Sequence, residues 1–154
     1  MGNHIDILHI FPLFHQYYRK IPILGDFMKE TNTRLTGDFY ADTKMFDELL
    51  RVDESFDIIK REMRFANTDI AMYYIDGFVQ SGSMQKLFMH LSNVKDFGDG
   101  SSDAAKNFAA ESLPAVEVDV TDSVDTLVTM VLAGCTAFFA DGFGKNAIVI
   151  DSRT

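Results

Sequence analysis

The chain has 154 residues, a net charge of −9 and a hydrophobic fraction of 47%, which suit one domain, or one domain with an arm. The acidity lies in the second half: residues 1–64 carry nine Lys/Arg against eleven Asp/Glu, and residues 65–154 carry five against twelve. This balance excludes a typical nucleic-acid-binding protein, which needs a basic face, and disfavours direct contact of that half with an anionic membrane.

Cysteine content and hydropathy set further limits. The single cysteine, Cys135, excludes an intramolecular disulfide, and its place between a helical pattern and an apolar run predicts a buried, unreactive thiol. The longest charge-free apolar stretch, residues 126–140, contains Gly134 and is shorter than the roughly 20 residues of a membrane span. Asp6 lies where a secretory signal has its basic region, so we expect neither a span nor a signal here.

Residues 1–42 are predicted to form an N-terminal arm and linker ahead of a domain over residues 43–154. The first part of the arm is dense in apolar and aromatic side chains. The simplest interpretation is that it packs on the domain or on a neighbouring chain; a segment lying at a membrane interface is the alternative. The candidate partner contacts are Ile10, Phe11, Phe14 and Tyr17.

The first predicted elements of the domain are a helix and two strands. Asp42 or Thr43 is expected to cap a helix that runs to about Val52. Phe56 to Phe65 is predicted as a strand with one charged face, which is typical of a sheet edge. Asp69 to Ile75 is apolar on both faces, which places this strand in the middle of a sheet covered by helices.

The middle of the chain predicts a helix, a loop and a strand. Ser81 or Ser83 is expected to cap a second helix with apolar residues at helical spacing. The segment from Lys95 to Ser112 is rich in Gly, Ser, Asp and Ala and predicts a mobile loop, with a turn of helix near its end. Alternation from Val116 to Val120 predicts a strand with one solvated face.

The last third reads as a helix followed by a strand hairpin. Polar residues around Ser123 precede an apolar helical pattern that Gly134 ends. Residues 137–140 and 147–150 are short apolar strands joined by a glycine-containing turn over residues 141–146. The order of elements predicts an α/β fold: a mixed sheet of about five strands with two βαβ crossovers and helices packed on the sheet.

Chemical motifs are absent or incomplete. Gly142 to Lys145 resembles the end of a phosphate loop but lacks the earlier glycine and the following Ser or Thr. The acidic residues between 96 and 107 do not match a calcium loop. No Ser, Cys or His set suggests a nucleophile. We therefore predict no catalytic residue, no metal site and no cofactor, and a protein that is not an enzyme.

Several short motifs in order resemble the spore germination receptor A-subunit family (GerA type), including its stage V sporulation protein AF-like members. They are SFD at 55–57, RE at 61–62, YYIDGFV at 73–79, PAVEV at 114–118, VLAG at 131–134 and FADG at 139–142. The closing IVIDSRT at 148–154 is similar to the segment before that family's Pro/Arg-containing linker. The resemblance covers roughly residues 43–154.

The resemblance implies the first soluble subdomain of a larger protein of the inner spore membrane, placed on the cytoplasmic side. Its expected role is non-catalytic: assembly and signalling in nutrient-triggered germination and ion release, beside other receptor subunits and in a homo-oligomer. The alternative is a free-standing small-ligand-binding or regulatory module, whose crevice would be lined by Tyr73, Tyr74, Phe138 and Phe139.

Overall fold

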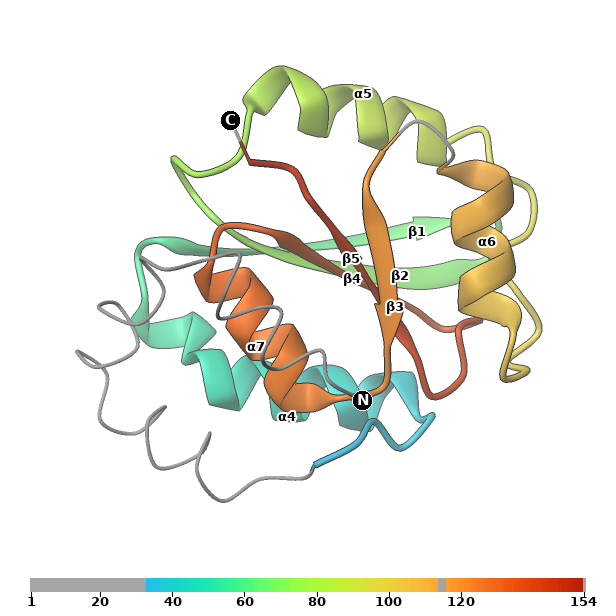
Figure 1. The fold of residues 1–154 in the computed structure, drawn as a ribbon, viewed down its shortest axis with the longest axis horizontal. Helices are drawn as coiled ribbons and strands as arrows, with labels where there is room; N and C mark the ends of the chain where they lie inside the picture. The colour runs from blue at the N-terminus through green and yellow to red at the C-terminus, as the bar shows by residue number, and fades with distance from the viewer. Residues whose placement is uncertain (1–32, 114–115, 154) are drawn as a thin grey trace.

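The computed structural model describes residues 33–113 and 116–153, and it contains one five-stranded sheet with helices on both faces (Figure 1). The strands are β1 (Ile58–Phe65), β2 (Thr68–Ile75), β3 (Val118–Thr121), β4 (Thr136–Ala140) and β5 (Ala147–Ile150). The helices are α4 (Phe39–Leu50), α5 (Ser81–Leu91), α6 (Ala104–Ser112) and α7 (Val124–Leu132), with a short 3-10 turn η1 (Val52–Glu54). The predicted α/β class and strand number are confirmed.

The strand order is β1-β2-β4-β5-β3, and all four pairings of neighbours are antiparallel. The prediction of a mixed sheet with parallel neighbours is therefore wrong. The strands β3 and β4, joined through α7, do run in the same direction, but β5 lies between them. The physical reason is the β4–β5 hairpin: its turn brings β5 back beside β4 and fills the position that a direct crossover would have given to β3.

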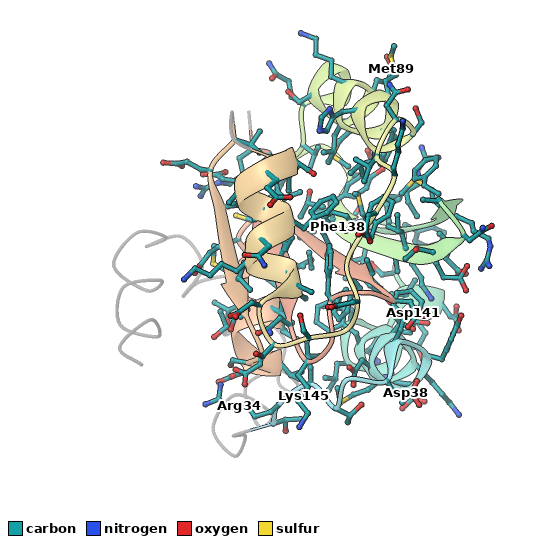
Figure 2. The ribbon with its side chains drawn as sticks, turned by 90° about the vertical axis from the view of Figure 1, so that its right-hand side faces the viewer. Arg34, Asp38, Met89, Phe138, Asp141 and Lys145 are labelled. Atoms are coloured by element: carbon teal, nitrogen blue, oxygen red, sulfur yellow. The ribbon has the colours of Figure 1, made fainter. Side chains whose placement is uncertain are left out.

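The two faces of the sheet carry separate hydrophobic layers. Helices α4 and α7 cover one face, where Phe46 packs on Tyr73, and α5 and α6 cover the other, where Phe108 packs on Phe138. Figure 2 shows Phe138 inside the molecule and Met89 on the outer surface of α5. Successive residues of a strand point to opposite faces, so β2 contributes apolar side chains to both hydrophobic layers, as predicted for a central strand.

The first helix begins earlier than predicted. Asp38, not Asp42 or Thr43, is the cap of α4, and its carboxylate accepts hydrogen bonds from the backbone N–H groups of Tyr40 and Ala41. Asp42 is buried and instead accepts from Thr36 and Gly37. The side chain that resembled a cap is therefore used to fold the preceding segment back onto the first turn of the helix.

The segment before α4 is joined to the domain. The N–H of Leu35 donates to the carbonyl of Asp122 at 2.9 Å, and the N–H of Val124 donates to the carbonyl of Thr33 at 3.0 Å. Leu35 is 4% exposed and belongs to the core below α4 and α7. The residues before the predicted domain boundary thus already pack on the start of α7.

The segment predicted as a loop contains a complete helix. α6 occupies residues 104–112, and Phe108 on its buried face stacks on Phe97 with ring centroids 5.1 Å apart. Before α6, the backbone crosses the β4–β5 turn closely enough for Gly100 N–H to donate to the Gly142 carbonyl at 2.9 Å. The segment therefore forms a helix despite its polar composition, because the helix buries one apolar face against the sheet.

The helix α7 and its ends follow the prediction. Ser123 caps α7 by accepting from Thr126 N–H, and Gly134 follows the helix with a positive φ of 104°. Cys135 is a free, fully buried thiol, as expected. Within the described ranges, no helix has the length and apolar character needed to cross a bilayer.

Candidate functional site

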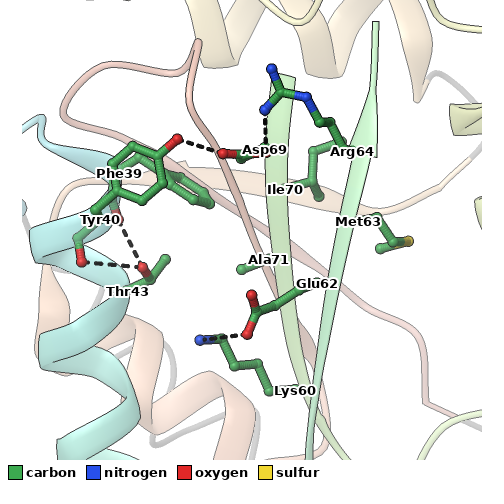
Figure 3. Close-up of a pocket in the computed structure, with 10 residues that line it drawn as sticks. All are labelled: Phe39, Tyr40, Thr43, Lys60, Glu62, Met63, Arg64, Asp69, Ile70 and Ala71. Carbon is green, nitrogen blue, oxygen red and sulfur yellow. Dashed lines mark hydrogen bonds and ion pairs between the residues drawn. The ribbon is translucent and has the colours of Figure 1, made fainter. Parts of the chain in front are cut away.

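A groove of about 360 Å³ lies between the first turn of α4 and the strands β1 and β2 (Figure 3). Residues of all three elements line it, and both polar and apolar side chains reach it. They are Phe39, Tyr40 and Thr43 from α4, Lys60, Glu62, Met63 and Arg64 from β1, and Asp69, Ile70 and Ala71 from β2.

The strand period explains why charges gather here. Lys60, Glu62 and Arg64 alternate along β1 and so project on one side of the sheet, toward α4. Their partners across the pair with β2 include Ala71, opposite Glu62, and Tyr73, opposite Lys60. Tyr73 fills the space below α4, whereas the methyl group of Ala71 leaves it open. The groove therefore exists because a small residue occupies this position of a strand that is otherwise bulky.

At one end of the groove, Asp69 is held by two donors. The hydroxyl of Tyr40 donates to one carboxylate oxygen, and Arg64 Nη1 lies 2.6 Å from the other. The hydrogen bond from Tyr40, followed by that from Arg64, lowers the pKa of Asp69 below its usual value. The same bond to Asp69 raises the pKa of the Tyr40 phenol. Both side chains keep their usual charge state at neutral pH.

At the other end, Lys60 lies at the centre of a second network. Its Nζ is 2.8 Å from Asp47 Oδ2 and 3.3 Å from Glu62 Oε1, and the hydroxyl of Tyr73 donates to Asp47 at 2.6 Å. Burial disfavours the ammonium ion, but the hydrogen bonds to Asp47 and Glu62 outweigh it and raise the pKa of Lys60. Burial, and then the bond to Asp47, raises the pKa of Tyr73.

The groove therefore carries both positive and negative side chains next to apolar ones. Each cation in the groove is already paired with a carboxylate, so an isolated anion or cation gains little there. A small zwitterion could exchange partners at both ends at once, its ammonium near Glu62 and its carboxylate near Arg64. Among the described residues, no three His, Cys, Asp or Glu side chains lie together in a way that could hold a metal ion.

The structure does not test the predicted partner contacts. Ile10, Phe11, Phe14 and Tyr17 lie outside the described residues. The groove has one signal in the sequence: Lys60, Glu62 and Arg64 place a charge at every second position of a predicted edge strand. The pattern by itself predicts a sheet edge and not a groove, because it does not show which helix lies above the strand.

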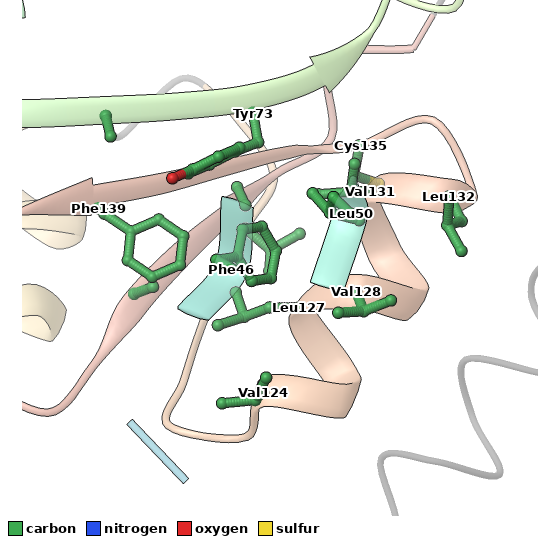
Figure 4. Close-up of a cluster of buried hydrophobic side chains, with 14 of the residues drawn as sticks. Phe46, Leu50, Tyr73, Val124, Leu127, Val128, Val131, Leu132, Cys135 and Phe139 are labelled. Atoms are coloured by element: carbon green, nitrogen blue, oxygen red, sulfur yellow. The ribbon is translucent and has the colours of Figure 1, made fainter. Parts of the chain in front are cut away.

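The alternative prediction, that four aromatic side chains line one ligand-binding crevice, is wrong. Tyr73 and Phe139 belong to the core under α4 and α7, as Figure 4 shows, and each packs against Phe46. Tyr74 and Phe138 belong to the core on the opposite face of the sheet. All four are at most 8% exposed. Consecutive residues of a strand cannot line one crevice, since they point to opposite faces.

Comparisons with known proteins agree with the fold. The family model of the Bacillus/Clostridium GerA spore germination protein matches residues 44–154. The chain is also similar to the crystal structure of the N-terminal domain of the A subunit of the Bacillus megaterium spore germinant receptor GerK3, with a TM-score of 0.60 and 17% identity. This similarity covers 81% of the chain and 50% of that structure, so the chain spans about half its length. No curated protein matches the chain.

Proposed function

Because the chain belongs to the Bacillus/Clostridium GerA spore germination protein family, we propose that it is the first soluble subdomain of a longer germination receptor A subunit or AF-type protein. The subdomain would comprise residues 43–154, with residues 33–42 packed against it and the preceding arm leading into it. Its function is to support assembly and signalling in nutrient-triggered germination and ion release, without catalysis. The observation that carries this proposal is the family match over residues 44–154.

The charge of the domain argues against direct contact with an anionic membrane surface. The described helices lack a candidate span, and residues 65–154 carry twelve Asp/Glu against five Lys/Arg. Such a charge is repelled by anionic head groups. The family resemblance supports the further proposal that the domain lies on the cytoplasmic side of the inner spore membrane, tethered by membrane helices that belong to the remainder of the protein.

The coding sequence and spore physiology test this function together. We expect the reading frame to continue past Thr154 into a second soluble region and several apolar spans. Spores whose gene lacks codons 33–153 in frame should lose nutrient-triggered ion release when this protein is their only receptor of its class. A stop codon directly after Thr154, or normal ion release by the deletion spores, would contradict the proposal.

The proposed partners are the other subunits of the receptor or ion-release complex and further copies of the chain. The proposed contacts are the arm residues Ile10, Phe11, Phe14 and Tyr17, because closely spaced apolar and aromatic side chains favour burial against a partner. The double substitution Phe11→Ser and Phe14→Ser should lower the oligomer mass measured by light scattering. An unchanged mass would reject this contact.

The groove favours a second candidate function, the binding of a small ligand with both charges. Its volume of about 360 Å³ suits a molecule of amino-acid size. A thermal-shift screen with amino acids, sugars and nucleotides would test this function, and we expect a response to zwitterionic amino acids. Substitution of Glu62 by Gln and of Arg64 by Gln should weaken the response. Equal behaviour of all compounds, or of variant and parent, would count against it.

A further inference from the structure

One end of the sheet exposes two aromatic side chains. Phe56 lies just before β1 and is 98% exposed, and Phe78 follows β2 and is 44% exposed. The N–H of Asp76 donates to the carbonyl of Asp57 at 2.7 Å, so the segments that carry the two rings are adjacent. Phenylalanine is commonly buried, so two exposed rings on adjacent segments together form an apolar surface that favours a partner.

The chain leaves the domain at the same end. Val79 and Arg153 form an isolated antiparallel bridge, and Gln80 N–H donates to the Ser152 carbonyl at 3.3 Å. A Cβ built on Gly134 would lie 3.1 Å from both the Phe78 ring and the methylenes of Arg153, so both cover Gly134. In Figure 1 the C terminus lies beside the segment that leads into α5. Any polypeptide that continues the chain therefore starts next to Phe78.

Three acidic residues, which we call the acidic rim, lie within three positions of the exposed rings along the chain. Asp53, Asp57 and Asp76 are exposed, and none of them forms an ion pair with a described residue. Since like charges repel, the acidic rim disfavours contact with another acidic surface, such as that of a second copy of this domain. It favours a segment in which an apolar side chain is flanked by Lys or Arg.

We propose that Phe56, Phe78 and the acidic rim form the docking surface for the polypeptide that continues beyond Thr154 in the longer protein. The segment that docks presents an apolar side chain to the two rings and basic side chains to the rim. This inference rests on the proposed function, which supplies the continuing chain. A tethered segment has an effective concentration of roughly millimolar, so a contact between a few side chains is sufficient.

The chain has no tryptophan, which allows a direct test. Phe56→Trp places an indole in the patch, and Met89→Trp places one near the far end of α5 from the chain exit, where Met89 is 70% exposed. Both variants are prepared in the 154-residue chain and in the protein extended through its second soluble region. Difference spectra against each parent remove the signal of any downstream tryptophan.

We expect the indole emission of the Phe56→Trp variant to shift to the blue and its acrylamide quenching to fall several-fold in the extended protein alone, with no change for the Met89→Trp control. Adding Asp57→Lys should restore part of the quenching. Equal quenching of the Phe56→Trp variant in both lengths would overturn the inference while leaving the proposed function intact. Protection that disappears on dilution would also overturn it, because the occupant would then be another molecule. A reading frame that stops after Thr154 would instead remove the proposed function.

Discussion

The close crossing of two loops predicts that Gly98→Ala is strongly destabilising. Gly98 has a φ of 124°, and a Cβ there would lie 2.5 Å from the Gly142 carbonyl oxygen and 2.9 Å from the Ala104 Cβ. The substitution therefore imposes backbone strain of about 1 to 3 kcal/mol. It also pushes the loops apart at the hydrogen bond from Gly100 to Gly142, which adds about 1 to 3 kcal/mol.

We expect a total loss of about 3 to 5 kcal/mol, a large part of the roughly 5 to 15 kcal/mol typical of a domain. Two matched variants separate the contributions. Gly77→Ala has a positive φ of 89° but no atom within 4 Å of the new methyl group, so it reports backbone strain alone. Gly142→Ala places its Cβ 2.7 Å from the Gly98 carbonyl oxygen without a positive φ, so it reports the steric contact alone.

Urea unfolding followed by circular dichroism measures these losses, provided that the m-value stays constant between variants. The double variant Gly98→Ala and Gly142→Ala should lose less than the sum of the two, since both separate the same contact. If Gly98→Ala costs no more than Gly77→Ala, the two loops do not approach each other closely enough for the Gly98 Cβ to meet the Gly142 carbonyl oxygen, which would refute this prediction.

Three further predictions concern a helix cap, the buried thiol and acid stability. Asp38→Ala should lower the free energy of unfolding by about 1 kcal/mol, whereas Asp38→Asn should retain most of it; equal losses would exclude capping. Burial raises the pKa of Cys135 to about 12, so Ellman's reagent at about pH 8 should label only unfolded protein, and rapid labelling of the folded chain would contradict this burial. Hydrogen bonds from Arg153 lower the pKa of Asp151, so its stabilising contribution is present above the unfolded pKa and is lost as pH falls through the folded value. Asp151→Asn should therefore reduce the difference in unfolding free energy between neutral and strongly acidic buffer, and an unchanged difference would contradict this assignment.

Local chemistry was sufficient to predict most elements. α7 lies between a serine cap and a glycine whose positive φ ends the helix, and both signals act within one turn of the chain. The strand β2 was correctly placed inside the sheet because it is apolar on both faces, and β1 at an edge because one of its faces is charged. Such features depend on the side chains of the element itself and are visible in a single sequence.

The strand order and the groove were decided only by the tertiary structure. The apolar strands β4 and β5 would suit several neighbours, and nothing in their residues states that β5 separates β3 from β4. Likewise, the groove needs α4 above Ala71, two segments that meet only after folding. Hydrogen-bond partners and burial of a strand depend on the free energy of the whole assembly, so the sequence determined which segments form elements, and packing determined which elements meet.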